Sequence, residues 1–452
     1  MRSRSLTALV LAIACLALVP LVQAAPAKDQ HVIVITVDGF PHWIWEDSKL
    51  PMPTLRKLAA EGISAPMKVS NPSVTWINHA TLATGVTPAK HHTMYNGLLT
   101  FPGNAQPPKI EQWRDKGEIV RVPTVYDYAF KAGLTTAHVD WVPTTNANTF
   151  NWDFAERPNP KGQIEQEMVK AGLITQPELD DFNRGNPPWR DLMWTRAAVH
   201  IMEKHKPNLL YFHLLNTDAN NHKYGPGSMA SLTAYAYADT CIRELIDALD
   251  RAKLREKTTI IIVTDHGFKT AQKLIRPNVI LRQNGLIQAA GPSIKSCDGY
   301  VMASGGVGLF YAVNSANKAE TIAKAKSLLS GLEGIAELVE PKDYAKYGIA
   351  TPDVNKQSPD LLLFAKSGYA FNASHVLDTP ITEVTSDAYP GHHGYLNTDP
   401  QLDGTFIISG AAVKRGVKID RITNLDIAPT TAHILGLTMP DVDGRVLKEL
   451  LK

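Results

Sequence analysis

Three apolar, β-branched runs recur along the chain, and each leads into an aspartate. The runs HVIVITVDG, NLLYFHLLNTD and TTIIIVTDHG end at Asp38, Asp218 and Asp265. They do not alternate between apolar and polar residues, which is typical of parallel strands covered on both faces. Helical patterns such as MPTLRKLAAEG, stopped by Gly62, and SLTAYAYADTCIRELIDALDRAK lie between them. This alternation predicts an α/β fold with a doubly wound, mostly parallel sheet and helices on both faces.

The chain has 452 residues, more than one small core requires. Its length predicts either one large α/β domain with insertions or two domains. The stretch from about 102 to 207 is rich in Pro, Trp and polar residues, and we expect it to decorate the active face. From about 269 to 389, a strand pattern (GVGLFYAV), a helix pattern (NKAETIAKAKSLLSG) and a second strand pattern (IAELVE) predict a small α/β insert.

The first residues have the layout of a secretory signal peptide. Arg2 and Arg4 precede the apolar run LTALVLAIACLALVPLV, and small residues place a cleavage site after Ala24. A membrane anchor is the alternative, but Pro20 interrupts the run. We therefore expect a signal peptide over 1–24, a mature chain over 25–452 without a transmembrane segment, and a secreted or periplasmic protein.

Composition excludes some classes of protein. Hydrophobic residues make up 44% and charged residues 20%, as in ordinary globular proteins, which excludes disorder as the main feature. The formal net charge of +2 gives no large basic field, so a nucleic-acid partner is not expected. Cys241 and Cys297 remain after cleavage, and the sequence leaves open whether they pair in an oxidising compartment.

The three aspartates are candidate metal ligands. Ligands bind beyond the carboxyl ends of the strands in such sheets, and converging carboxylates repel unless a cation or protons neutralise them. Four histidines lie close to the aspartates or in the later GHHGY motif: His222, His266, His392 and His393. Mixed Asp and His ligands suit zinc, and manganese or iron fits them too. There are enough ligands for two metal ions, an arrangement suited to phosphoryl transfer, although each aspartate alone is more often a turn former or a helix cap.

A further motif, PSVTWINH, supplies a candidate nucleophile. The order of Asp-Gly, PSVTWINH, Asp-x3-His, TDHG and HGY resembles the alkaline phosphatase superfamily, and within it the nucleotide pyrophosphatase/phosphodiesterase family, from about Val32 to Leu447. That family carries a threonine nucleophile followed by an aromatic residue and Asn-His, as Thr75, Trp76 and Asn78-His79 stand here. We expect Asn78 and His79 to hold the turn through backbone hydrogen bonds, and the helix to begin with HATLATG.

The resemblance implies a zinc-dependent phosphoric ester hydrolase with two zinc ions. It assigns Asp218, His222 and His393 to one ion, and Asp38, Asp265 and His266 to the other, with Thr75 as the nucleophile that the second ion contacts. Thr75 would attack phosphorus and form a phospho-threonine, which water then hydrolyses. Asn96 would donate a hydrogen bond to a phosphoryl oxygen, and Trp76 would flank the leaving group.

The choice of substrate rests on charge. Monoesterases of this superfamily add a third cationic group, whereas HVDWVPTTNANTFNWDF contains no Lys or Arg. The expected substrate is therefore a small phosphate ester, a nucleotide-like diester or a phosphoanhydride. Candidate walls for its second substituent are Tyr95, Phe150, Trp141 and Trp152, and candidate cations are Lys90 and Lys223. The family often has Ser-Gly before the His222 position, where this chain has Asn220-Asn221.

Two alternatives remain at this point. One is a phosphomonoesterase or a phosphonate hydrolase of the phosphonoacetate type in the same superfamily. The other is a non-catalytic phosphate- or metal-binding protein on the same scaffold, against which the intact Thr75 and the six ligands argue. The sequence does not name the physiological substrate or the oligomeric state.

Overall fold

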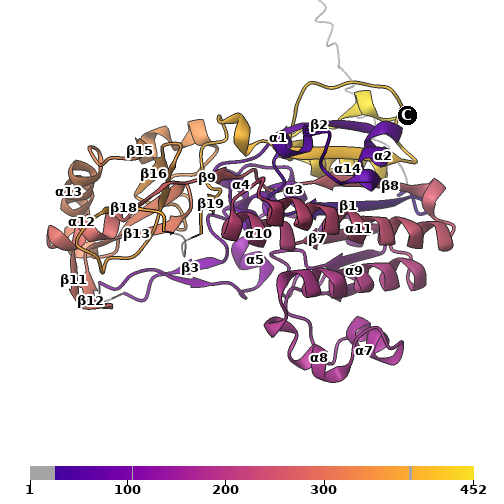
Figure 1. The fold of residues 1–452 in the computed structure, drawn as a ribbon, viewed down its shortest axis with the longest axis horizontal. Coiled ribbons are helices and arrows are strands. Elements are labelled where there is room, and N and C mark those ends of the chain that lie inside the picture. Colours follow the sequence, from indigo (N-terminus) through magenta and orange to yellow (C-terminus); the bar gives the residue numbers. More distant parts are fainter. Residues whose placement is uncertain (1–25, 104, 386–388) are drawn as a thin grey trace, which may run out of the picture.

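The computed structural model describes residues 26–103, 105–385 and 389–452, so the expected signal peptide over 1–24 lies outside the described residues. Its centre is an eight-stranded sheet, with its strands spread one below another in Figure 1. The strands lie in the order β21 (Ile422–Thr423), β2 (Ile63–Lys68), β20 (Gly404–Gly410), β8 (Thr258–Val263), β1 (His31–Val37), β7 (Leu209–Leu214), β5 (Thr136–Val139) and β6 (Trp152–Phe154). The run from β8 to β6 is parallel, and only β20 pairs antiparallel with its neighbours. The predicted mostly parallel α/β sheet is confirmed.

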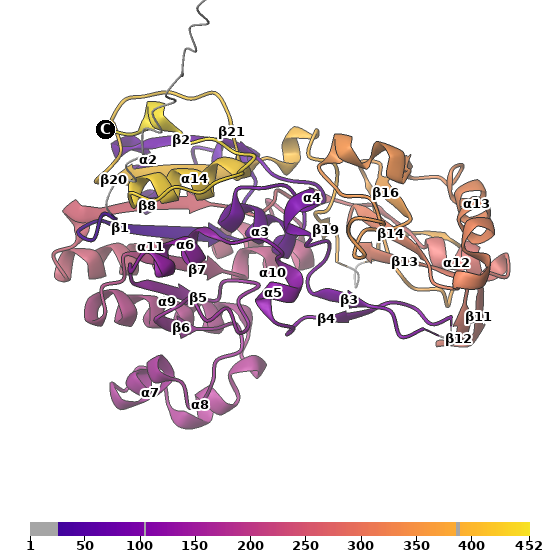
Figure 2. The ribbon, with the colours of Figure 1, turned by 180° about the vertical axis from the view of Figure 1, so that it is seen from behind.

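Both faces of the sheet are buried, which explains why its strands show no polar alternation. Along β1, Ile33 and Ile35 face one core, and Val32 and Val34 face the other. The first core includes α9 (Pro187–Lys204), α11 (Met229–Arg251) and α2 (Pro53–Glu61), and Figure 1 shows α9 and α11 in front of the sheet. The second core includes α6 (Val125–Lys131), α14 (Ile427–Ile434) and residues of α3 (Thr75–Thr84), which face the viewer in Figure 2.

A smaller unit with its own core lies beside the sheet (Figure 1). Its four-stranded sheet has the order β13 (Gly299–Ser304), β14 (Val307–Ala312), β16 (Leu361–Ala365) and β15 (Ile335–Val339), flanked by α12 (Pro277–Gln283), α13 (Lys318–Leu329) and the hairpin β11 (Ile287–Ala290)–β12 (Ser293–Cys297). The patterns GVGLFYAV, NKAETIAKAKSLLSG and IAELVE form β14, α13 and β15. A shared apolar cluster joins Ile77 of α3 to Leu309 of β14.

The two cysteines lie in different cores and are both free. Cys241 is buried in the core under α11, and Cys297 is buried in the core of the smaller unit. The pairing that the sequence leaves open is not formed in this structure.

The segment 102–207 contains several kinds of element. β4 (Lys109–Glu111) pairs with β3 (Leu98–Thr100), whereas β5 and β6 join the central sheet. An excursion between β6 and α9 carries α7 (Gln163–Lys170) and α8 (Gln176–Asp180), and lies below the sheet in Figure 1. None of the helices in the described part of the chain is long and apolar enough to cross a bilayer.

Candidate active site

The motif PSVTWINH turns the chain into α3. Thr75 is the first residue of the helix, so the helix begins four residues earlier than the sequence predicts. Asn78 holds this turn, as expected: its Oδ1 accepts the Ser70 N–H at 2.8 Å, and its amide donates to the carbonyls of Pro72 (3.2 Å) and Val74 (3.0 Å). The turn therefore holds the Thr75 hydroxyl at the N-terminal end of a helix, where backbone N–H groups favour anions.

His79 plays a different part from the one expected. Its Nε2 lies 3.0 Å from the Thr36 hydroxyl of β1, and no backbone group of the described residues bonds to the ring. The expectation of a backbone bond is wrong because the side chain points across α3 into the sheet, where its ring packs 4.5 Å from Trp141 and 4.7 Å from His213. His79 thereby anchors α3 to β1.

Asn96 lies next to the start of α3. Its Oδ1 accepts the Trp76 N–H at 3.0 Å, which satisfies one of the backbone donors that a helix start leaves free. This bond fixes the carboxamide beside Thr75, so the opposite end of the amide is left to donate to a ligand.

One group of candidate ligands lies at the carboxyl ends of β1 and β8, which are parallel neighbours. Nε2 of His266 is 3.4 Å from Oδ1 of Asp38 and 3.3 Å from Oδ2 of Asp265. The same nitrogen lies 3.3 Å from Oγ1 of Thr75. All three ligand side chains are buried. They and the threonine oxygen converge on one point.

The Asp-Gly turn after β1 shapes this group. Gly39 has φ +61°, and a Cβ at this residue would lie 2.5 Å from the Phe268 ring. Its N–H donates to Oδ1 of Asp265 at 3.1 Å, which orients that carboxylate. Its carbonyl accepts a hydrogen bond of 2.7 Å from Asn221, which is one of the two residues that replace the Ser-Gly of the family. Asn221 thus holds the turn from the opposite side.

A second group contains Asp218, His222 and His393, with one ligand atom from each within 4.8 Å of the others. The sequence places Asp218 at a strand end, which is wrong: β7 ends at Leu214, and Asp218 lies in the first turn of α10 (Asn216–Tyr224). The four-residue spacing puts His222 on the same helix face, with its Nε2 3.4 Å from Oδ1 of Asp218.

Backbone carbonyls orient the histidines of the second group. Nδ1 of His222 donates to the Gly391 carbonyl at 2.8 Å, and Nδ1 of His393 donates to the Ser73 carbonyl at 2.8 Å. Each Nε2 is therefore left for a metal, as in many protein metal sites. The neighbouring His392 lies on β19 (Gly391–His392), with its ring 6.1 Å from that of His222, and is not part of either group.

The two groups lie side by side. The rings of His266 and His393 stack with centroids 3.7 Å apart and an angle of 7° between their planes. The structure thus brings together Thr75 and all the residues that the resemblance assigns to metal ions.

The electrostatics of the site call for a cation. Burial, together with the charges of Asp265 and Asp218, raises the pKa of Asp38 well above its usual range. Three buried oxygens, Oδ1 of Asp38, Oδ1 of Asp218 and Oδ2 of Asp265, have no hydrogen-bond partner among the described residues. Buried carboxylates are stable only when paired or bound to metal, so this donor set fits divalent ions.

His213 is a site residue that the sequence reasoning missed. It lies inside β7, and its Nε2 donates to Oδ2 of Asp38 at 3.1 Å. Its Nδ1 lies 3.2 Å from the carbonyl and 3.2 Å from Oδ2 of Asp140. Burial opposes the charged ring, but Asp140 and Asp38 raise the pKa of His213 well above its usual range. A histidine within an otherwise apolar strand is the signal that could have identified it.

Asp191 of α9 is the second missed residue. Its carboxylate accepts the N–H groups of Leu215 at 3.0 Å and Asn216 at 3.2 Å, and burial raises the pKa of Asp191 to about 7. It therefore fixes the start of α10, the helix that carries Asp218 and His222.

A cavity of about 330 Å³ lies beside Trp76, which is itself 5% exposed. Its walls include Trp113, Trp141, Glu156 and the exposed Arg157, a cation just beyond the segment in which the sequence shows none. A larger cavity of about 630 Å³ lies between α2 and α11 and contains none of the site residues.

Of the walls proposed from sequence, only Trp141 lines the cavity beside Trp76. The Tyr95 hydroxyl donates to the Ala303 carbonyl, Phe150 packs on Tyr126, and Trp152 stacks on His205. The proposed cations are also occupied elsewhere or exposed: Lys90 pairs with Asp443, and the ammonium of Lys223 lies over the Tyr224 ring.

The sequence model of the type I phosphodiesterase/nucleotide pyrophosphatase family matches residues 32–396. The chain belongs to this family. The resemblance seen in the motifs is thereby confirmed, and with it the place of the chain in the alkaline phosphatase superfamily. The family is one of metal-dependent phosphoesterases, and the described residues include groups that could hold metal ions.

Curated relatives agree with this assignment. The ectonucleotide pyrophosphatase/phosphodiesterase family member 7 of Mus musculus is 22% identical over 456 residues, which cover 99% of this chain and 93% of that protein. The venom phosphodiesterase 2 of Crotalus adamanteus is 23% identical over 243 residues, which cover 54% of this chain and 27% of that protein.

Solved structures show the same fold. Human ectonucleotide pyrophosphatase/phosphodiesterase 5 matches with a TM-score of 0.70 and 17% identity, covering 94% of this chain and 100% of that one. An inactive variant of the murine protein, solved in complex with AMP, matches with a TM-score of 0.71 and 16% identity over the same shares of the two chains.

Proposed function

We infer that the chain is a secreted or periplasmic phosphodiesterase/nucleotide pyrophosphatase with two metal ions, which cleaves phosphodiester or phosphoanhydride bonds through a phospho-threonine at Thr75. The observation that supports this most directly is the convergence of the Thr75 oxygen with two adjacent groups of three ligands. Export is supported by the signal-peptide layout of residues 1–24 and by relatives that are named ectonucleotide enzymes.

Asp38, Asp265, His266 and Thr75 would hold one ion, and Asp218, His222 and His393 would hold the other. Zinc is the ion that their mixture of oxygen and nitrogen donors suits best, and manganese or iron would also fit. When bound, the ions supply charge that favours the Thr75 alkoxide and neutralises the non-bridging phosphoryl oxygens.

The residues of the chain then act in sequence. Thr75 Oγ1 attacks phosphorus in line, a bond from oxygen to phosphorus forms, and the bond to the leaving group breaks. Asn96, held by its bond to the Trp76 N–H, donates its amide to a phosphoryl oxygen. Water attacks the phospho-threonine and restores Thr75.

We assign the base of the nucleotide substituent to the cavity beside Trp76. Its indole-rich walls offer flat apolar surfaces to a base, and a nucleotide fits the names of the relatives and the AMP complex of the murine neighbour. The substrate is therefore a small nucleotide-like diester or anhydride.

The test compares two esters with purified, zinc-loaded protein: p-nitrophenyl thymidine monophosphate as the diester and p-nitrophenyl phosphate as the monoester. We expect faster turnover of the diester, lost with a chelator and restored by zinc. Faster turnover of the monoester would instead support a phosphomonoesterase. No turnover of either ester, with metal bound, would favour a binding protein on the same scaffold.

A further inference from the structure

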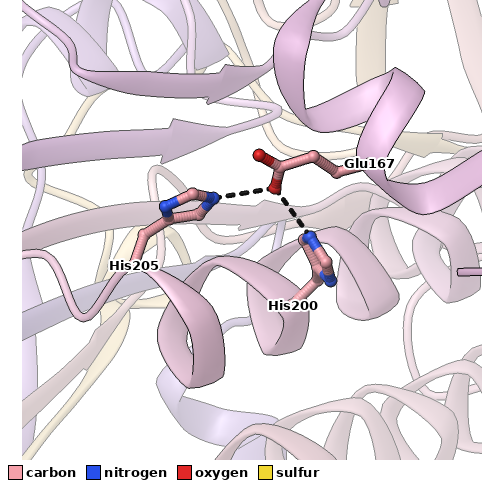
Figure 3. A group of neighbouring side chains, drawn as sticks. All are labelled: Glu167, His200 and His205. Atoms are coloured by element: carbon pink, nitrogen blue, oxygen red, sulfur yellow. Dashed lines mark hydrogen bonds and ion pairs between the residues drawn. The ribbon is translucent and has the colours of Figure 1, made fainter. Parts of the chain in front are cut away.

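A third group of metal-ligand side chains lies between α7 and the C-terminal end of α9. Figure 3 shows the two imidazoles of His200 and His205 pointing at one carboxylate, that of Glu167. Nε2 of His200 lies 2.9 Å and Nε2 of His205 lies 2.8 Å from the same atom, Oε2 of Glu167. The side chains are partly buried, with exposures of 14%, 12% and 18% in that order. The cluster is therefore shielded but open to an ion from solvent.

This cluster is separate from the candidate active site. Asp191, which supports the active site, lies near the start of α9, and His205 follows it by fourteen residues. At 1.5 Å per residue, this spacing corresponds to about 21 Å along the helix. The two sites therefore share a helix but no ligand.

We propose that Glu167, His200 and His205 form a binding site for a divalent first-row transition-metal ion such as zinc. A tetrahedral ion with bonds of about 2.0–2.1 Å places neighbouring ligand atoms about 3.4 Å apart. The present contacts between Oε2 and each Nε2 need to lengthen by only about half an ångström to reach that spacing. Two imidazoles and one carboxylate are also the ligand set of open, three-ligand zinc sites, with water in the fourth position.

Lys204 determines how tightly the site binds an ion. Its ammonium lies 3.1 Å from Oε2 of Glu167, and its side chain is 51% exposed. An ion takes the place of this ammonium and of the hydrogen bonds from the two imidazoles to Oε2, and the lysine has room to move into solvent. The positive charge that remains nearby opposes the ion, so removing it tightens binding.

The site would fasten the α7–α8 excursion to the sheet layer. Glu167 belongs to α7, whereas His200 belongs to α9 and His205 is the residue that follows the end of that helix. Trp152 of β6 stacks on His205 with ring centroids 4.6 Å apart and an angle of 23° between the planes. An ion bound to His205 therefore lies close to an indole that can report its binding.

The first test is metal binding by chelator-stripped full-length protein. Zinc bound per chain is counted by mass spectrometry of the metal after dialysis, and Co²⁺ is titrated while Trp fluorescence is followed. We expect Glu167→Gln and His205→Asn each to bind one equivalent fewer than wild type and to lose the Co²⁺ quenching that comes from Trp152. Trp152→Phe should lose that quenching and keep the zinc. Equal zinc and equal quenching in wild type and Glu167→Gln would overturn the proposal.

Lys204→Met is the matched variant, because it removes the competing charge and keeps every ligand. We expect it to bind Co²⁺ at this site about fivefold more tightly, the effect of about 1 kcal/mol from one unit charge at close range in water. Unchanged or weaker binding would contradict the proposal, even if the Glu167 and His205 variants fail to fold.

Asp218→Asn separates this site from the active site. It should lower the metal content of the active site and leave the fluorescence response of Trp152 intact. Loss of that response in Asp218→Asn would mean that the signal belongs to the active site, and the proposal would fail while the proposed hydrolase activity stood.

Discussion

At the scale of single residues, the question for Thr75 is whether its hydroxyl attacks phosphorus or only stabilises the start of α3. Thr75→Ala keeps α3 and the neighbouring ligands but removes the attacking oxygen, so turnover of the diester should fall by about 10³-fold or more. Thr75→Ser keeps a hydroxyl, so it should retain most of the activity that the alanine variant loses. Both are measured by initial rates at equal zinc content. Activity of the alanine variant near that of wild type would remove Thr75 from the mechanism.

His213 acts on the site through Asp38, since its Nε2 holds one carboxylate oxygen and leaves the other for a metal. His213→Gln should therefore weaken metal binding by about 10- to 100-fold, the usual effect of losing a group that orients a ligand. Competition with a fluorescent zinc chelator measures this.

The matched control is His31→Gln. That histidine is also buried, but it bonds to the Pro207 carbonyl at the opposite end of β1. Equal loss of zinc in both variants would mean that a buried histidine matters only for stability.

At the scale of elements, α10 places two ligands on one face, and the carboxylate of Asp191 binds the backbone N–H groups at the start of this helix. Asp191→Ala leaves the Leu215 and Asn216 N–H groups buried without their acceptor, which costs about 1–3 kcal/mol of stability. It should also lower zinc affinity, because α10 carries Asp218 and His222. Urea unfolding and chelator competition measure the two effects.

Asp239→Ala is the comparison for this element. Asp239 accepts the N–H groups of Thr54 at 3.1 Å and Leu55 at 2.9 Å at the start of α2, a helix without site residues. We expect a similar loss of stability with zinc affinity unchanged. If Asp191→Ala also leaves zinc affinity unchanged, its role is that of an ordinary cap.

The strands, and the edge of the sheet at which the site lies, could be predicted from sequence because strands buried on both faces consist of continuous apolar runs. The runs before Asp38 and Asp265 therefore locate the site directly. The start of α3 at Thr75 could not be predicted, because it depends on side-chain bonds from Asn78 to the backbone of Ser70, Pro72 and Val74. The role of His213 depends on register, since β7 pairs with β1 so that His213 lies opposite Thr36, close to Asp38. The role of Asp191 depends on how α9 packs, because its carboxylate accepts N–H groups of Leu215 and Asn216, far along the chain.

At the scale of the whole molecule, the site is assembled from distant segments. Thr75 comes from α3, Asp38 and Asp265 from two neighbouring strands, and His393 from the chain that returns after the smaller unit. His393 reaches back to the Ser73 carbonyl, so its position depends on the smaller unit folding against the sheet. Burying the three carboxylates of the assembled site costs stability unless a cation is bound.

Acid should destabilise the whole fold through His91, which lies outside the site. Burial, with a contribution from His92, lowers the pKa of His91 from 6.5 to about 3. Below pH 6.5 the unfolded chain binds a proton that the folded chain does not, so stability present above that pH is lost as pH falls toward about 3, by roughly 1.4 kcal/mol per unit from this residue. His91→Gln keeps polar contacts to the Thr81 hydroxyl and the Thr93 N–H but cannot titrate. Urea unfolding at steps between pH 8 and 4.5 should show the variant less stable than wild type at pH 8 and the gap closing below pH 6.5. If the free energies of unfolding of wild type and variant run parallel over this pH range, His91 does not cause the loss of stability in acid.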